Sequence, residues 1–255
     1  MKKLLRSTLV LCTVTAFAIP PASAQVSVSS SVFFGSPYVW RGEVLSGGWV
    51  FQPSISAGYG GFSATFFGNV DPNSVYVHDK VHWQEADLTL AYGTSLSDVA
   101  LTAGYTLYNF PTPAGDEIKL LNTQELFGSV GLASGPVQPS LFVAYDFDDN
   151  AENPLKGLYA EGKVAVPFES GGQNFNFAAT LGLDAGYYQK YYLTVDPTVG
   201  DDQTSLSHLA LSVATSFDAG PVTLSPLAAL QISLDDTYKQ AFGNRFFYGG
   251  FTIAF

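Results

Sequence analysis

The sequence predicts an all-β fold, a transmembrane antiparallel up-and-down β-barrel of 12 strands. Three observations carry this prediction: segments of alternating polarity recur along the chain, their connections alternate between short and long, and the last segment ends in an uncharged stripe. Successive side chains of a strand point to opposite faces, so each such segment has one face suited to lipid and one suited to water.

The chain begins with residues 1–24, which have the features of a secretory signal peptide and precede a predicted outer-membrane barrel domain, residues 25–255. Its basic start carries Lys2, Lys3 and Arg6. The apolar run Leu9–Ile19 is too short to span a bilayer, and the small residues of Ala22–Ala24 suit a signal peptidase. We expect the mature chain to begin at Gln25.

Cleavage at that point changes the charge and the cysteine content. The basic count falls from 11 to 8 while the acidic count stays at 22, so the formal net charge falls from −11 to −14. A strongly acidic chain predicts no nucleic-acid partner. Cys12, the single cysteine, is removed with the signal peptide, so the mature chain has neither a disulfide nor thiol chemistry.

The predicted strands follow one another without a linker or a charge block. They are Val26–Phe34 (which could continue to Arg41), Trp49–Tyr59, Phe62–Val70, Trp83–Tyr92, Val99–Tyr108, Thr123–Leu132, Val137–Phe147, Gly157–Phe168, Phe175–Tyr187, Ser205–Phe217, Val222–Leu234 and Phe246–Phe255. Nowhere after the signal peptide does an apolar stretch reach the roughly 20 residues of a membrane helix. The low charged fraction, 13%, is therefore attributed to strands.

The connections between these segments alternate in length. Short, Gly-rich ones lie at 58–61, 93–98, 133–136, 169–172 and 218–221, and longer polar ones at 35–48, 71–82, 109–122, 148–156, 188–204 and 235–245. Short turns at one end and long loops at the other, with both termini at the short-turn end, are typical of an outer-membrane barrel. A soluble sandwich or a lipocalin-like barrel does not require this alternation.

Parity within the strands separates apolar from charged residues. The predicted outward sets include Ala86, Leu88, Leu90 and Tyr92; Val137, Leu141, Val143 and Tyr145; Phe175, Phe177, Leu181 and Leu183; and Leu209, Leu211, Val213 and Phe217. None of them is charged. Because a charge facing lipid near the middle of the membrane costs on the order of 2–4 kcal/mol, this segregation indicates a lipid-facing exterior.

The last strand carries a predicted assembly signal, formed by Phe251, Ile253 and Phe255 on one face. We expect this strand to close the barrel against Val26–Phe34, with both termini periplasmic. The expected partners are outer-membrane lipids, lipopolysaccharide, the barrel-assembly machinery and small solutes.

The opposite parity gives a predicted lumen lining. It consists of Glu85, Asp87, Glu125, Asp146, Glu161, Lys163, Asp184 and His208. A surplus of carboxylates raises the local cation concentration, which predicts a weak cation preference. The alternative is that these charges form structural pairs. The inward aromatic residues Phe33, Phe67, Phe127, Phe142 and Tyr159 could narrow the lumen, seal it or contact a solute.

The sequence predicts no catalytic residues, no metal site and no cofactor. His208 and Ser212 share a strand face but lie four residues apart, about 13 Å along a strand and beyond hydrogen-bond reach. The segment 146–150 begins with calcium-loop spacing, but Ala151 replaces the required glycine and Gly157 the closing glutamate. We interpret it as a solvated acidic loop.

The start of the mature chain resembles the TorF-type family of outer-membrane porins. The resemblance is carried by Ser36–Gly42 (Ser-Pro-Tyr-Val-Trp-Arg-Gly), Gly48, Gln52, Gly61, Phe62 and Gly68–Asp71 (Gly-Asn-Val-Asp), and covers about the first third of the mature chain. Pro37 stands where the family pattern has aspartate. The resemblance implies a porin-like role and an outer-mouth cluster of Arg41, Gln52, Asn69 and Asp71. That cluster could be a structural brace, in which Arg41 neutralises Asp71, or a solute filter.

The leading functional prediction is a porin-like channel in the outer membrane of a Gram-negative bacterium, for passive diffusion of small hydrophilic solutes or ions. The alternative is a plugged barrel with a structural or surface-binding role and no transport. An enzyme is not expected.

Overall fold

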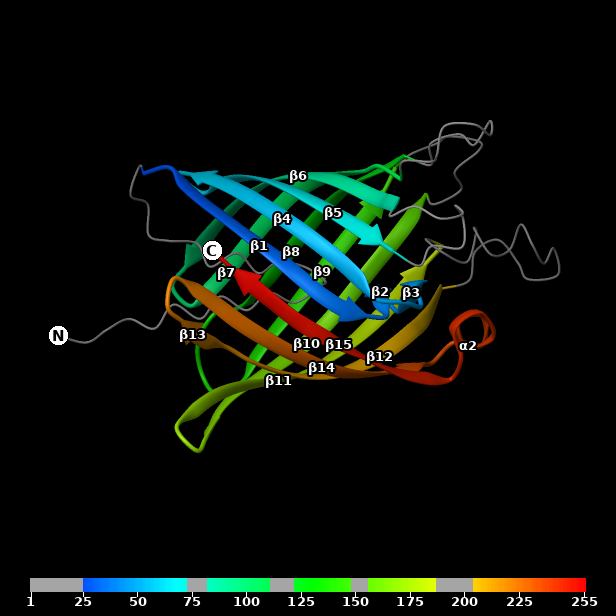
Figure 1. Cartoon of the computed structure of the whole chain (residues 1–255). Helices are drawn as coiled ribbons and strands as arrows, with labels where there is room; N and C mark the ends of the chain where they lie inside the picture. The colour runs from blue at the N-terminus through cyan, green and yellow to red at the C-terminus, as the bar shows by residue number, and fades with distance from the viewer. Residues whose placement is uncertain (1–24, 73–81, 111–121, 148–155, 187–203) are drawn as a thin grey trace.

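The structure, a computed structural model, describes residues 25–72, 82–110, 122–147, 156–186 and 204–255. Within them, twelve antiparallel crossings form one closed barrel (Figure 1). The predicted signal peptide, residues 1–24, lies outside the described residues, as do segments of four of the predicted long loops.

The barrel wall is built from strands that each pair with their neighbours in the sequence. They are β1 (Ser27–Ser36), β4 (Val50–Tyr59), β5 (Phe62–Asp71), β6 (His82–Leu96), β7 (Val99–Tyr108), β8 (Thr123–Leu132), β9 (Gln138–Asp146), β10 (Gly157–Ser170), β11 (Gln173–Ala185), β12 (Thr204–Thr215) with its short continuation β13 (Phe217–Ala219), β14 (Val222–Ser233) and β15 (Arg245–Ala254). β1 pairs with β15, with Phe34 opposite Phe251 and Val32 opposite Ile253, and this contact closes the ring.

The predicted fold class is confirmed, and strand boundaries differ by only a few residues. The largest difference is in β6, which continues to Leu96 instead of ending at Tyr92, because its ladder with β7 runs as far as the pair Leu96 and Val99. The two described ends of the chain, at 25 and 255, lie at the same end of the barrel, called here the turn end (Figure 1). The C-terminal ends of β1, β5, β7, β9, β11 and β14 lie at the opposite end, called here the loop end.

Two elements at the loop end were predicted as loop. A hairpin of β2 (Tyr38–Trp40) and β3 (Glu43–Ser46) follows β1, and a short helix, α2 (Asp236–Phe242), follows β14. β1 therefore ends at Ser36 and does not continue to Arg41. The helix begins where the Asp235 side chain accepts a hydrogen bond from the backbone N–H of Thr237 (2.8 Å), and it ends at Gly243, whose φ is 84°.

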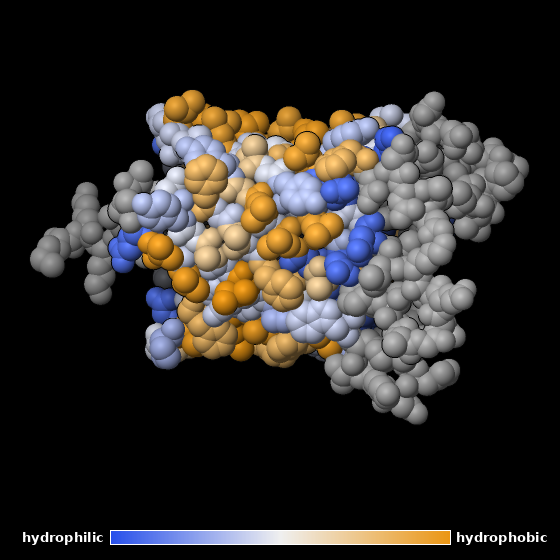
Figure 2. All heavy atoms as spheres, turned by 90° about the horizontal axis from the view of Figure 1, so that it is seen from above, coloured by the Kyte–Doolittle hydropathy of each residue, from blue (hydrophilic) through white to orange (hydrophobic). Residues whose placement is uncertain are grey.

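The outward side chains form an apolar wall, and Figure 2 shows hydrophobic residues over this wall between hydrophilic ones toward the ends. Exposed large hydrophobic residues include Ile55, Phe66, Leu90, Leu126, Leu141 and Phe177. Their parity agrees with the registers, which place Leu90 beside Tyr105 and Leu126 beside Tyr145 on the same face. No helix among the described residues is long and apolar enough to cross a membrane.

The outward face can be tested with two adjacent arginine substitutions in β6. Leu90, 48% exposed, faces outward, whereas Thr89 faces the lumen and its hydroxyl oxygen lies 3.1 Å from that of Thr106. We expect Leu90→Arg to lower the free energy of unfolding from lipid vesicles by about 2–4 kcal/mol, because the charge must enter hydrocarbon. Thr89→Arg should cost much less in the same urea titration. Equal losses would contradict the assignment of the two faces.

Candidate functional site

The candidate site is the hairpin β2–β3, which folds into the barrel at the loop end (Figure 1). Trp40 pairs with Glu43 across a two-residue turn, Arg41–Gly42, in which both residues have positive φ, 48° and 91°. This is the geometry of a type I′ turn, which usually carries Asn-Gly or Asp-Gly. An arginine at this position adopts a sparsely populated backbone conformation. This conformation places Arg41 at the tip of the hairpin.

Arg41 is buried, 4% exposed, and forms an ion pair with Glu125 on β8. Its Nη2 atom lies 2.8 Å from Glu125 Oε1, which also accepts a hydrogen bond from the Tyr108 hydroxyl at 2.9 Å. The guanidinium carbon lies 4.5 Å from the centre of the Trp40 ring and 4.8 Å from that of Tyr159. Ion pairing and cation–π contact together offset the desolvation of the charge.

Glu43, at the start of β3, is buried beside the helix α2. Burial raises the pKa of Glu43 well above its usual value, and the nearby Asp184 raises it further, while Arg41 acts in the opposite direction. Tyr238 of α2 donates a hydrogen bond to Asp184 Oδ2 at 3.0 Å. The pKa of Tyr238 is raised by burial and by Asp184, so it remains a neutral donor.

Aromatic residues of the wall pack against the hairpin. Phe142, Tyr159 and Tyr238 form one buried cluster with Trp40 and Phe127, and Phe33, Tyr38 and Val50 form a second with Trp40 and Phe67. Trp40 therefore joins both clusters. The five aromatic residues predicted to face inward all belong to these two groups, so the structure places them around the hairpin.

The turn itself rests on the opposite wall. Gln231 of β14 donates a hydrogen bond to the carbonyl of Gly42, and a Cβ atom added to Gly42 would lie 2.5 Å from His208 Nδ1. Glycine is favoured here, because φ is positive and because a side chain would meet the ring of His208. A cavity of about 20 Å³, the size of about one water molecule, lies beside these residues and Glu161.

The predicted outer-mouth residues divide into two groups: Gln52, Asn69 and Asp71 belong to the wall strands β4 and β5, whereas Arg41 belongs to the hairpin. Gln52 donates a hydrogen bond to Asn69 (3.1 Å), which in turn donates to Gln84 (3.1 Å). Asp71 accepts a hydrogen bond from Ser46 at the end of the hairpin. Arg41 lies deeper, at Glu125, because the hairpin carries it into the barrel instead of along an extended β1.

The eight predicted lumen residues all lie on the inner face of their strands. Seven are no more than 7% exposed; they are Glu85, Asp87, Glu125, Asp146, Glu161, Asp184 and His208, and the eighth, Lys163, is half-buried. Glu85 and Asp87 lie two residues apart on the inner face of β6, where both side chains are buried.

Many of these carboxyl groups have side-chain partners. Thr123 donates a hydrogen bond to Asp146, and Tyr159 donates to Glu161 at 2.7 Å. Such contacts agree with the structural-pair interpretation of the inward charges. Among the described residues, these carboxyl groups nevertheless outnumber the inward cations Arg41 and Lys163, so the lumen at this level is an acidic environment.

Toward the turn end the inner face changes to small hydroxyl-bearing residues. These include Ser54, Ser56, Thr65, Thr89, Thr102 and Ser129, which are half-buried. Ser56 and Thr65 lie opposite each other with their hydroxyl oxygens 2.7 Å apart. The inner wall here is polar and carries few charges; Lys163 lies at this level, opposite Ser140 and Thr180.

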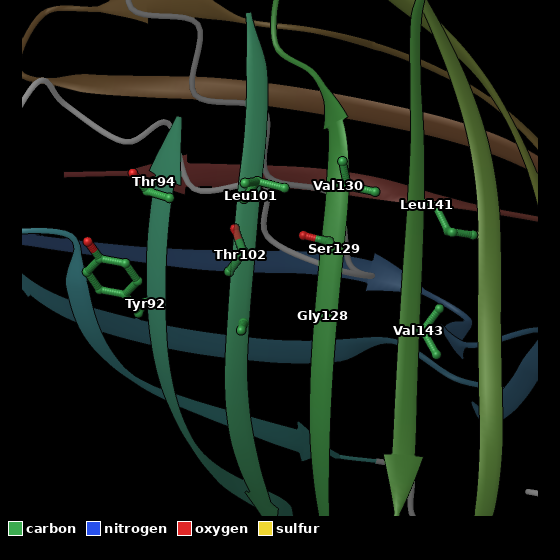
Figure 3. A pocket seen from close by; sticks show the side chains of 10 residues that line it. Tyr92, Thr94, Leu101, Thr102, Gly128, Ser129, Val130, Leu141 and Val143 are labelled. Atoms are coloured by element: carbon green, nitrogen blue, oxygen red, sulfur yellow. The ribbon is translucent and has the colours of Figure 1, made fainter. Parts of the chain in front are cut away.

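A hollow of about 410 Å³ lies on the outer face of β6–β9, away from the lumen (Figure 3). Ala103 and Gly128 are opposite each other and leave the space, and its rim carries Tyr92, Leu101 and Val143. These residues have outward parity. The hollow therefore belongs to the apolar wall and not to the candidate site.

Sequence reasoning missed several residues of the site. Glu43, Ser46 and Tyr238 lie in predicted loops, and Trp40 was identified only as part of the segment that carries the family resemblance. It also missed Ser207, because a bulge between β11 and β12 turns both Ser207 and His208 inward. The Ser207 hydroxyl lies 3.0 Å from His208 Nδ1, and the serine is fully buried. Alternation by two cannot reveal such a pair.

Comparisons with known proteins assign no family to the chain. No known family model and no curated protein matches the chain. Among solved structures, the NanC porin is 12% identical, with 89% of this chain and 98% of that chain covered and a TM-score of 0.47. Pseudomonas aeruginosa OccK5 (OpdH) is 8% identical, with 90% and 66% covered and a TM-score of 0.40. A further porin is 10% identical, with 91% and 99% covered and a TM-score of 0.34. The resemblance to TorF-type porins stays a prediction.

The buried ion pair predicts how the hairpin responds to loss of its arginine. Arg41→Met should release the hairpin, because breaking a buried pair costs about 3–5 kcal/mol. Amide hydrogen exchange within Tyr38–Ser46 should then quicken by about 100-fold or more. Lys239→Met is the matched control, since the ion pair of Lys239 with the exposed Asp236 of α2 lies at the surface. Unchanged exchange in Arg41→Met would show that the ion pair does not hold the hairpin.

Proposed function

We propose that the protein is an outer-membrane channel for passive diffusion of small hydrophilic solutes or ions, with its termini in the periplasm. The observation that carries this proposal is the opposition of the two faces of one closed sheet. The outer face is apolar, whereas the inner face carries carboxylates, hydroxyls and amides. Such a barrel is stable in lipid and offers a polar interior to water.

The width of the barrel agrees with a narrow channel. Barrels of about eight strands are nearly filled by their side chains, and those of about 16 enclose an open aqueous pore. Twelve crossings lie between these limits. The hairpin β2–β3 and Tyr238 of α2 occupy part of the interior at the loop end, so this level is the constriction of the proposed channel.

The charges at the constriction favour cations. Glu43, Glu125, Glu161 and Asp184 surround the hairpin tip, where Arg41 is the cation. An excess of carboxyl groups attracts cations and repels anions even when some of them are protonated or paired. We therefore propose a weak cation preference.

The inserted hairpin also supports a second candidate function, a plugged barrel with a structural or surface-binding role. Its buried side chains and its contacts with several wall strands would suit a permanent plug. The two candidates differ in one measurable property, the passage of ions.

Planar-bilayer recordings of the purified, refolded protein test the choice. We expect discrete channel events from the wild type, and larger ones from a variant in which residues 37–48 are replaced by a short Gly/Ser linker, because that variant lacks the constriction. A heat-dependent shift on an SDS gel controls for folding of both proteins. Events from the linker variant alone would support the plug, and no events from either would refute the channel.

Charge selectivity is tested by reversal potentials in a salt gradient, using two neighbouring lumen residues of opposite charge. Glu161→Gln should weaken the cation preference, and Lys163→Gln should strengthen it, because each substitution removes one inward charge from β10. Both replacements keep a hydrogen-bonding side chain of similar length. A wild-type channel that passes anions more readily than cations would contradict the proposed preference.

A further inference from the structure

The hairpin is attached to the barrel in a way that permits movement. β2 and β3 form a two-stranded sheet of their own, separate from the sheet of the wall. They are joined to β1 and β4, which pair directly with each other. The hairpin can therefore leave the lumen without breaking the ladder that closes the barrel.

Side chains, and not a shared ladder, hold the hairpin in the lumen. Arg41 is bound by Glu125, the carbonyl of Gly42 by Gln231, and Ser46 by Asp71. Each of these three contacts is polar and would be replaced by water if the hairpin left, whereas the packing of Tyr38 and Trp40 against the wall would be lost. A change of one buried charge at the hairpin shifts the free-energy difference between its inserted and released positions.

The sensitive charge belongs to Glu43. It lies near Asp184 of β11, Tyr238 of α2 and Arg41 of its own turn. The residues around the adjacent tip are Glu125 of β8, Tyr159 and Glu161 of β10, and His208 of β12. The buried Oε1 atom of Glu43 has no hydrogen-bond partner among the described residues. An ionised Glu43 would thus be buried beside a second carboxyl group, which is costly.

We propose that the hairpin Tyr38–Ser46 is a gate of the channel, which closes when Glu43 takes up a proton and opens when Glu43 releases it. This inference rests on the proposed channel function and assigns its regulation.

The direction of the pH dependence follows from linkage. Insertion raises the pKa of Glu43 above its usual value of 4.5, so the inserted hairpin binds the proton more tightly than the released one does. The closed state is most stable below the usual pKa and loses stability as the pH rises toward the raised pKa. Arg41 stays charged throughout this range. A single coupled proton changes the open-to-closed ratio by at most about tenfold per pH unit.

Single-channel recordings between about pH 5 and about pH 8 test the gate. We expect the wild type to open more often as the pH rises. Glu43→Gln, which cannot ionise, should stay mostly closed with a flattened pH response. Asp236→Asn, the matched control, removes a carboxylate that is exposed on α2 and should respond as the wild type does. A wild-type pH response in Glu43→Gln would overturn the proposal.

A disulfide crosslink supplies an independent test. A Cβ atom on Gly42 would lie 3.2 Å from His208 Cβ, close to the spacing of about 3.5–4.5 Å in disulfides, and the predicted mature chain has no cysteine of its own. The oxidised Gly42→Cys/His208→Cys protein should lose pH-dependent opening, and reduction should restore it. His208→Cys alone is the control, because Gly42→Cys alone would bring a side chain against the ring of His208.

The outcomes separate the gate from the channel. If the variant with the linker in place of residues 37–48 conducts at every pH while the crosslinked and wild-type proteins respond to pH identically, the gate is wrong and the channel stands. If the linker variant conducts at no pH, the channel function fails and the gate fails with it.

Discussion

Closure of the hydrogen-bond ladder is the constraint on which the rest of the structure depends. In hydrocarbon an unpaired backbone N–H or C=O costs several kcal/mol, so a sheet can cross lipid only if no strand is left at an edge. Here β15 pairs with β1 on one side and β14 on the other, which leaves neither end of the sheet open. Once the ring is closed, the parity of every strand is fixed: one face meets lipid and must be apolar, and the other encloses an interior that can hold polar groups.

The size and polarity of that interior explain why the site contains the hairpin and α2 and is rich in carboxyl groups. Twelve crossings enclose more space than the wall side chains fill, and the hairpin and α2 enter from the loop end. A polar wall can receive them because its carboxyl groups, hydroxyls and amides offer partners to Arg41, Gly42 and Ser46. As a consequence, several carboxyl groups lie close together in a small volume, and Asp184 raises the pKa of Glu43. Repulsion between such neighbouring carboxylates makes the position of the hairpin sensitive to their ionisation.

The wall was predictable from sequence because its physics is periodic. Alternation by two, a charge-free outer parity and alternating loop lengths define each crossing, and the strand ends agree within a few residues. The hairpin was not predictable, because Arg41–Gly42 lacks the usual Asn-Gly or Asp-Gly signal and its strands are only three and four residues long. The resemblance to TorF-type porins singled out Arg41, but its partner Glu125 lies 84 residues away and comes near only through insertion of the hairpin. Ser207 was not predicted to face inward, because a bulge interrupts the alternation of side chains in β12.

The separate sheet of the hairpin also has a consequence for how such proteins diverge. The wall strands are constrained by lipid and by their neighbours, whereas β2 and β3 are constrained only by the residues that receive them. Relatives could therefore exchange the hairpin for one of another length or chemistry without altering the barrel. The positions that contact it, Glu125 on β8 and Asp184 on β11 among them, would then change together with the hairpin. Substitutions would be correlated between positions that are distant in the sequence, while the wall residues between them would stay the same.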